Sequence, residues 1–436
     1  MEKHSVCLLN DSFPPLIDGV ANTVVNYANE ITDRYGSACA VIPMYPDIND
    51  ERFPFPVYRY PSIDTSKLLG YRSGYPFSPE IAKKLTEQKV ELLHCHCPLA
   101  SAFMARSLRE LLDAPLVLTY HTKFDIDIAN IFRSKVLQEA AIRLIAQNIA
   151  TCDEVWVVSQ GAGENLRSIG YEGDYTVMPN GVDMPRGRLP EDEIRRAVRD
   201  YDLPADVPLY LFVGRMMWYK GLKLILDALA KMKAQGQSFR MVFIGTGGDY
   251  DDVRQYAAFV GLEEVCFFTG AIQDRNEIRA WYCRADLFLF PSTFDTNGLV
   301  VREAAACGLA AVLIEGSCAA EGITDGRNGF LIPETAAALA AKLHSLNTEK
   351  MHAVGDCACR ELYLSWSDAV ARAVTEYEII LDRHRRGYYQ QRRKTALDSF
   401  FKLQGDIMDA VAKLRDFTES VQSGLDNIDL FGGGEL

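Results

Sequence analysis

Short apolar runs alternate with segments of helical periodicity along most of the chain. The helical periodicity is clearest at residues 101–112 and 134–150, where apolar residues recur every three or four positions. Strands and helices that alternate in this way build a parallel sheet with helices on both faces, so the pattern predicts a doubly wound α/β fold. The apolar runs that we expect to form strands are 5–11, 38–45, 90–96, 115–121, 154–159 and 175–181 in the first half, and 209–215, 240–247, 265–271, 285–292, 310–316 and 329–333 in the second half.

The alternation is interrupted at residues 184–207, a charged stretch that contains proline and has no long apolar run. A chain of 436 residues also exceeds the size of one ordinary hydrophobic core. We therefore predict two doubly wound, Rossmann-like domains, residues 1–185 and 186–365, that face each other across a cleft. A crossover helix at 366–385 is expected to return to the first domain.

The last part of the chain, residues 386–436, is predicted to be a helical extension. The basic sequence RHRRGYYQQRRK at 383–394 leads into it, and apolar residues then follow at mostly helical spacing. Two interpretations stay open. An amphipathic helix can dock on its own core or on a second subunit, which gives a homo-oligomer, and the basic patch can instead attract an anionic membrane surface.

Composition and charge narrow the classes of partner and compartment. With 59 acidic and 46 basic residues the formal net charge is -13, which argues against a general nucleic-acid binder. The eleven cysteines are scattered without a regular framework, as in reduced cytosolic proteins. The first apolar run is too short for a signal-peptide core, and no stretch is long enough to span a membrane. We expect a cytoplasmic protein, soluble or peripheral on the inner face of the cell membrane.

Candidate binding residues stand where strands are expected to end, because ligands of doubly wound domains bind at the carboxyl ends of the strands. Gly19 follows the first strand and opens a helix, so the backbone there can approach a phosphate closely. Arg215 and Lys220 follow the first strand of the second domain, and a guanidinium and an ammonium there suit a pyrophosphate. Each could also be an ordinary loop residue, and it is their placement that favours binding.

The stretch FPSTFDTNGLVVREAAACG, residues 290–308, places two carboxylates on either side of a helix start near Asn297 or Gly298. Asp295 lies before the helix and can serve as its N-cap or as a turn residue. Alternatively, Asp295 lies beside free backbone amides and Glu303 lies within the helix, an arrangement that suits a bound sugar, phosphate and ribose.

Histidines mark two further strand ends. His121, in TYHT, is expected to face the cleft. It can be a structural histidine or a functional one, and the sequence favours neither interpretation over the other. In HCHCP, residues 94–98, strand alternation places His94 and His96 on one face and the two cysteines on the other. The four side chains cannot then share one tetrahedral ion, so we expect no zinc site there.

The motif DTNGLVVREAAACG resembles the signature of retaining glycosyltransferases of family 4, in which a carboxylate and a Glu frame seven residues. The resemblance extends in the family's order over roughly residues 5–385 and implies the GT-B fold. TYHT is similar to the corresponding run of bacterial diacylglycerol glucosyltransferases. The other matching segments are Gly19, SQGAGENL (159–166), MPNGVD (178–183), GRMMWYKG (214–221), IGTGGDY (244–250), FTGAI (268–272), FPS (290–292) and DGRNGFLIP (325–333).

The resemblance implies a role for each matching residue. His121 and Asp295 are the candidate catalytic residues, with His121 orienting donor and acceptor near the transferred sugar. The family usually has Glu at the position of Asp295, so the shorter side chain puts the sugar contact in question. The resemblance implies that Arg215 and Lys220 bind the diphosphate of the donor, with Gly19 behind it, and that Glu303 binds the ribose. Asp295 and the backbone amides near Asn297, Gly298 and Leu299 would bind the transferred sugar. Backbone groups after Gly270 would contact the base.

These inferences together describe a retaining hexosyltransferase. It would move a hexose from a nucleotide sugar, UDP-glucose or similar, to a membrane lipid such as diacylglycerol, with no metal and no cofactor. The acceptor hydroxyl would attack from the side that the nucleotide leaves. Two alternatives stay open: an acceptor that is a polysaccharide or a small molecule, and a non-catalytic scaffold that binds a nucleotide sugar.

Overall fold

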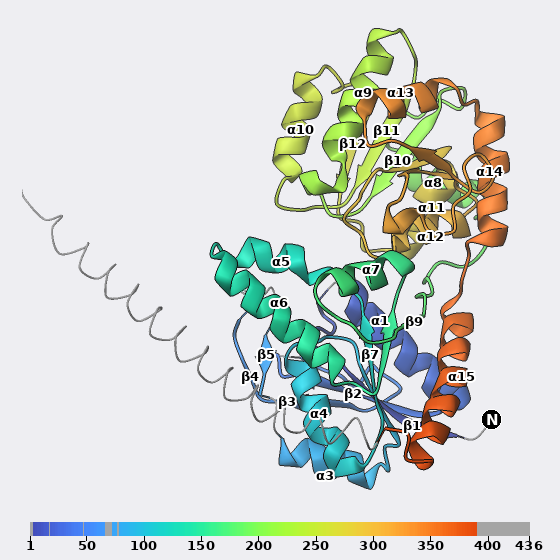
Figure 1. Cartoon of the computed structure of the whole chain (residues 1–436). Coiled ribbons are helices and arrows are strands. Elements are labelled where there is room, and N and C mark those ends of the chain that lie inside the picture. The colour runs from blue at the N-terminus through green and yellow to red at the C-terminus, as the bar shows by residue number, and fades with distance from the viewer. Residues whose placement is uncertain (1–2, 17, 47, 66–71, 76–77, 390–436) are drawn as a thin grey trace, which may run out of the picture. The chain divides into compact units, whose positions relative to one another are not determined.

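Two parallel β-sheets, each surrounded by helices, organise the structure (Figure 1). The computed structural model describes residues 3–389 except 17, 47, 66–71 and 76–77. Both sheets lie in one compact unit, Met1–Ile380. They have separate hydrophobic cores, because the buried apolar residues of the first sheet and its helices form one cluster and those of the second sheet form another.

The first sheet has seven strands in the order β3-β2-β1-β6-β7-β8-β9. All six residues of β1 are buried, and successive side chains point to opposite faces, so helices must cover both faces of this sheet. Its strands are β1 (His4–Leu9), β2 (Gly36–Pro43), β3 (Val57–Tyr60), β6 (Leu92–Cys95), β7 (Leu116–Tyr120), β8 (Glu154–Val157) and β9 (Thr176–Val177). The helices between them are α1 (Gly19–Glu30), η1 (Ile31–Tyr35), α3 (Pro79–Glu87), α4 (Ala100–Leu112), α5 (Phe124–Ile131), α6 (Lys135–Ala150) and α7 (Gln160–Ser168).

The second sheet has six strands in the order β12-β11-β10-β13-β14-β15. They are β10 (Leu209–Val213), β11 (Arg240–Ile244), β12 (Cys266–Gly270), β13 (Leu287–Phe290), β14 (Ala311–Ile314) and β15 (Phe330–Ile332). The helical segments are α8 (Glu191–Val198), η2 (Trp218–Lys220), α9 (Leu222–Ala234), α10 (Tyr250–Phe259), α11 (Arg275–Arg284), α12 (Leu299–Ala306), η3 (Cys318–Ala320), α13 (Ala336–His344), α14 (Thr348–Glu361) and α15 (Trp366–Arg385).

The predicted fold class is confirmed: every apolar run that was expected to form a strand contains one, and the two sheets are Rossmann-like. Three further strands were not predicted: β3, and the short hairpin of β4 (Ser62–Ile63) and β5 (Ser73–Gly74). Because β3 is an edge strand with the sequence VYRY, only one of its residues is fully buried and its apolar signal is weak. The predicted extension at 386–436 lies largely outside the described residues, and so do residues 390–394 of the basic segment 383–394.

Strand order reverses once in each sheet. In the first sheet β1 pairs with β2 on one side and with β6 on the other, and in the second β10 pairs with β11 and β13. The helices that follow the two central strands therefore leave in different directions and open a crevice at the carboxyl ends. Gly19 follows β1, Arg215 follows β10 and Asp295 follows β13, so the strand order itself brings these three residues to the two crevices.

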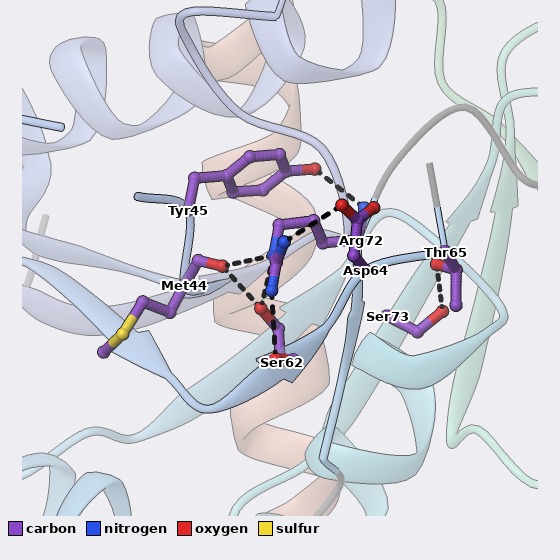
Figure 2. A network of polar contacts seen from close by, with 7 residues as sticks. All are labelled: Met44, Tyr45, Ser62, Asp64, Thr65, Arg72 and Ser73. Atoms are coloured by element: carbon purple, nitrogen blue, oxygen red, sulfur yellow. Dashed lines mark hydrogen bonds and ion pairs between the residues drawn. The ribbon is translucent and has the colours of Figure 1, made fainter. Parts of the chain in front are cut away.

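Arg72 anchors the β4–β5 hairpin to the end of β2 (Figure 2). Its Nε donates to the Met44 carbonyl at 3.1 Å and to Ser62 Oγ at 2.9 Å, and its guanidinium lies 3.6 Å from the Asp64 carboxylate. The backbone N–H of Arg72 donates to the Tyr45 hydroxyl at 3.2 Å. A hairpin this short depends on such side-chain contacts because it has few ladder hydrogen bonds of its own.

Helix α15 packs on the first sheet, beside α1. The Tyr377 hydroxyl lies 2.5 Å from His94 Nδ1, and the Tyr377 ring stacks on Trp156 with centroids 5.4 Å apart. Trp366 at the start of α15 makes an edge contact with Tyr27 of α1. Through the part of the chain that is described, no helix has the length and apolar character needed to cross a bilayer.

Candidate functional site

A cavity of about 240 Å³ lies at the carboxyl ends of the strands and is lined by residues of both domains. Eight of the nine predicted site residues line it, and Glu303 does not. The eight are Gly19, His121, Arg215, Lys220, Asp295, Asn297, Gly298 and Leu299. A larger hollow of about 590 Å³, near Tyr201 and Arg254, contains none of the predicted residues. We place the site in the smaller cavity, because polar groups converge there from separate elements.

Lys220 and Asp295 form an ion pair at the centre of this cavity. Lys220 Nζ lies 2.6 Å from Asp295 Oδ1, and the Lys220 side chain is only 8% exposed. A charge this deeply buried requires a partner, and Asp295 supplies it. The other carboxylate oxygen, Asp295 Oδ2, is enclosed and has no hydrogen-bond partner among the described residues. One oxygen therefore neutralises the lysine, and the second has no hydrogen bond within the described residues.

Asp295 does not cap the helix that follows it. The N-cap of α12 is Gly298, which has a left-handed backbone (φ 60°), and no side chain caps this end of the helix. A Cβ on Gly298 would lie 2.8 Å from Ala319 Cβ, so both the backbone conformation and the packing require glycine. Of the two interpretations of Asp295, the capping one is wrong. The free amides and positive dipole end of α12 face the cavity instead.

Asn297 adds a polar side chain with unused hydrogen-bonding capacity. It is 7% exposed, and neither its Oδ1 nor its Nδ2 has a partner within the described residues. Leaving a buried amide unpaired costs about 1–3 kcal/mol, so such groups are rare in folded proteins and often belong to binding sites. From the sequence, Asn297 was assigned to the site because of its place at the helix start; its burial could not be read from the spacing.

Arg215 and Gly19 line the cavity from different domains. The Arg215 side chain is exposed and makes no hydrogen bond or ion pair with any described residue, so its guanidinium is available to an anion. A Cβ on Gly19 would contact nothing closer than Leu299 Cδ1 at 3.9 Å, so no packing constraint within the protein requires glycine there. The open backbone instead leaves space for a ligand at the start of α1.

Glu303 is not among the residues that line the cavity and is held by two residues of α11. Its Oε1 lies 2.6 Å from Arg275 Nη2, and the Tyr282 hydroxyl donates to its Oε2 at 3.1 Å. Burial and the neighbouring Glu303 raise the pKa of Tyr282 well above its usual value, so the hydroxyl keeps its proton. Sequence analysis did not identify Arg275 or Tyr282, because nothing in their spacing relates α11 to α12.

Three histidines connect the cavity to the interior of the first domain. The rings of His94 and His96 lie 4.0 Å apart on one face of the sheet, while Cys95 belongs to the apolar core, as strand alternation predicted. His96 Nδ1 lies 3.0 Å from Nε2 of His121, which lines the cavity. Within the described residues no three His, Cys, Asp or Glu side chains gather as metal ligands. Burial lowers the pKa of His121 to about 3 and the pKa values of His94 and His96 well below 6.5.

These three pKa values predict that the protein loses stability in mild acid. Between the unfolded pKa of about 6.5 and the folded value of about 3, the unfolded chain binds a proton at His121 that the folded chain does not. The free energy of unfolding should therefore fall as the pH decreases below 6.5, by about 1.4 kcal/mol per pH unit for each such histidine. His121→Gln should have a shallower slope than the wild type in urea unfolding between pH 7 and 5, and equal slopes would contradict the assignment.

Asn297→Leu should leave the ligand-free protein at least as stable as the wild type, since it removes a buried amide that makes no hydrogen bond with any described residue. We expect a gain of about 1 kcal/mol in the free energy of unfolding. The matched control is Asn328→Leu, because Asn328 is also buried but bonds Thr324 N, the Gly322 carbonyl and Glu361. This control should lose about 2–4 kcal/mol. If both variants are destabilised alike in urea, Asn297 has a structural role.

Comparisons with known proteins are consistent with this fold. A family model described as Glycosyltransferase Family 4 matches residues 17–186, and one described as Glycosyl transferases group 1 matches residues 193–355, so the two between them match most of the chain. The Anabaena protein HepE, solved in complex with UDP, has a TM-score of 0.68 at 20% identity, with 86% of this chain and 99% of that chain covered. At this identity the likeness concerns the fold.

Curated relatives are also similar. The sulfoquinovosyl transferase of Arabidopsis thaliana is 29% identical over 65% of this chain, and the match spans about half (53%) of that protein. The alpha-monoglucosyldiacylglycerol synthase of Streptococcus pneumoniae is 21% identical over 69% of each chain. With two domain models that follow each other along the chain and a GT-B fold, this protein belongs to the glycosyltransferases, with a family 4 domain followed by a group 1 domain.

Proposed function

We propose that the protein transfers a hexose from UDP-glucose, or from a similar nucleotide sugar, to a hydroxyl of a membrane lipid such as diacylglycerol. The anomeric configuration of the sugar is retained, and no metal ion takes part. The observation that carries this proposal is the cavity at the N-terminus of α12, where a buried Lys–Asp pair meets a guanidinium and an amide that have no side-chain partner among the described residues.

The cationic side of the cavity suits the diphosphate. Arg215 presents a fork of N–H donors, Lys220 a buried positive charge, and α12 its free amides and positive dipole end. Negative charge develops on the nucleotide diphosphate as the bond to the sugar breaks. Fixed donors stabilise that charge without reorganisation, so they can serve as a metal would in other transferases.

The other side of the cavity suits the sugar. Asp295 Oδ2 can accept a hydrogen bond from a hydroxyl, and the Asn297 amide can both donate and accept. Asp295 is also tied to Lys220, so the same pair connects the sugar end of the donor to the phosphate end. His121 reaches the cavity from the first domain and is assigned to the sugar and the acceptor.

Glu303 is assigned to the ribose of the nucleotide. Its carboxylate already accepts from Arg275 and Tyr282, which hold it in one orientation on α12. Each carboxylate oxygen has more than one acceptor position, so a ribose hydroxyl can add to these contacts. Arg275 and Tyr282 would then position Glu303 for the ribose.

Support for a lipid acceptor comes from relatives that are named as a sulfoquinovosyl transferase and a glucosyldiacylglycerol synthase. The TYHT run also supports a lipid acceptor, because it is similar to the corresponding run of diacylglycerol glucosyltransferases. The basic segment 383–394 supports it too, because basic residues attract anionic headgroups. We accordingly propose that the protein works in the cytoplasm at the inner face of the membrane. A polysaccharide or small-molecule acceptor is the alternative within the same reaction class.

Arg215→Ala should weaken the binding of UDP-glucose and of UDP by about 10- to 100-fold, since a charge-assisted hydrogen bond contributes about 1.5–3 kcal/mol. The thermal midpoint should hardly change, because Arg215 has no partner to lose within the described residues. Arg254→Ala is the matched control: Arg254 is an exposed arginine of the same domain that lines the other hollow, and its loss should leave affinity unchanged. Titration calorimetry that finds equal affinities in both variants would reject the diphosphate site.

The wild-type protein should form a glucosyl lipid when it is incubated with UDP-glucose and vesicles of phosphatidylglycerol and diacylglycerol. The new glycosidic linkage should be α, because the donor linkage is α and the configuration is retained. Proton NMR of the purified product reads this linkage. A β-linked product would refute retention. Transfer restricted to soluble sugars would refute the lipid acceptor, and binding of the donor without hydrolysis or transfer would favour a non-catalytic scaffold.

A further inference from the structure

His96 lies behind the cavity and contacts it through His121. It is 2% exposed, and its backbone N–H donates to the Leu9 carbonyl at 2.8 Å, which fixes it to the neighbouring strand β1. Its ring packs against His94, 4.0 Å away, and against Tyr27 at 5.6 Å. An imidazole held this firmly can determine the orientation of the group that it bonds, as second-layer residues do around many active sites.

The bond between His96 Nδ1 and His121 Nε2, at 3.0 Å, can run in two directions. If His121 donates, His96 must carry its own proton on Nε2, and the Nδ1 of His121 is then an acceptor. If His96 donates, the proton of His121 must sit on Nδ1, which makes His121 a donor. Both rings are neutral because burial lowers both pKa values, so one proton lies between them and the choice is between two tautomers.

Burial of His96 Nε2 favours the second direction. This atom is enclosed and has no hydrogen-bond partner among the described residues. In the first direction it would be a buried N–H without an acceptor, and orphaned buried N–H groups are rare. In the second direction it is a bare lone pair, and under-satisfied acceptors are tolerated more often. The unpartnered nitrogen therefore indicates that His96 carries its proton on Nδ1.

When His96 donates to His121, the proton of His121 lies on its Nδ1, which can donate to a ligand in the cavity. With Nε2 of His121 taken by His96, the free ring nitrogen is Nδ1, which makes no hydrogen bond within the described residues. The backbone of His121 is also fixed, because its carbonyl accepts from Thr296 Oγ1 at 2.6 Å, next to Asp295. Both the ring and the backbone of His121 are thus held in place before any ligand binds.

We propose that His96 is a positioning residue that holds His121 in its Nδ1–H tautomer, so that His121 donates a hydrogen bond to a hydroxyl oxygen of the transferred sugar. This rests on the proposed function, because it assigns the sugar to the cavity that His121 lines. The neighbouring His94 is satisfied on both nitrogens, by Tyr377 Oη at 2.5 Å and Thr119 Oγ1 at 2.7 Å, and supports the ring of His96 without competing for its proton.

Two substitutions of His96 separate positioning from packing. In His96→Asn the amide nitrogen is attached to Cγ, as Nδ1 is in imidazole, so an N–H donor stays near its original place. His96→Leu fills similar space without any donor. We expect kcat/KM with UDP-glucose to fall about 10- to 100-fold in His96→Leu and to stay within about 5-fold of wild type in His96→Asn. The control is His352→Asn, at a half-exposed histidine of the second domain, and it should leave kcat/KM with UDP-glucose unchanged.

Ring nitrogen NMR of the full chain, labelled at its seven histidines, tests the tautomer without substrate. The His121 signals, assigned by their absence in His121→Gln, should report a protonated Nδ1 in the wild type and in His96→Asn. In His96→Leu the proton should no longer be confined to Nδ1. A protonated Nε2 on His121 in the wild type overturns the inference, and so do equal losses of kcat/KM in His96→Leu and His96→Asn.

The two possible failures can be told apart. If the wild type binds neither UDP-glucose nor UDP, the proposed function fails, and the role of His121 toward a sugar fails with it. If the wild type binds and transfers glucose but the NMR signals place the proton on Nε2, the inference about His96 fails alone.

Discussion

The constraint on which the structure depends is that parallel strands buried on both faces leave no place for polar chemistry except at their ends. β1, β6, β7, β10 and β13 are buried along their length and consist mostly of apolar residues. Unpaired charges or amides inside these strands would cost several kcal/mol each. The reversal of strand order beside β1 and β10 then opens a crevice at the carboxyl ends. Arg215 and Lys220 follow β10 and Asp295 and Asn297 follow β13, the strands at the reversal in the second sheet, while His121 follows β7 of the first sheet.

Within the cavity, the pairing of Lys220 with Asp295 connects the two ends of the site. A buried lysine needs a carboxylate, and the position that the family usually fills with Glu is filled here with Asp at 2.6 Å from Nζ. Gly221 makes this approach possible: a Cβ there would lie 2.3 Å from the Pro291 carbonyl oxygen, so the turn after Lys220 lies directly against the segment that leads to Asp295. The shorter carboxylate is thus committed to Lys220 through one oxygen and leaves the other for a ligand.

The histidines illustrate how a site extends beyond the residues that line it. His121 reaches the cavity, but His96 and His94 are fully enclosed, and the chain of contacts continues to Tyr377 on α15. Helix α15 is the last described helix of the chain, yet it contributes to the packing of a strand end in the first domain. Burial keeps all three rings neutral, so their hydrogen bonds rather than their charges determine how they act.

The sequence alone determined the fold class, the strands of both sheets except the edge strand β3, the strand ends that carry the chemistry and the family resemblance, because these follow from periodicity and from spacing within single elements. Eight of the nine predicted site residues line the cavity for the same reason. The tertiary structure decided which partners they have: Asp295 pairs with Lys220 rather than capping α12, Glu303 lies between Arg275 and Tyr282, and His96 bonds His121. Spacing fixes the face of a helix or strand on which a side chain lies, but a contact between residues far apart in the chain depends on how separate elements pack. The burial of Asn297 and of His96 Nε2 could for that reason not be inferred from the chain alone.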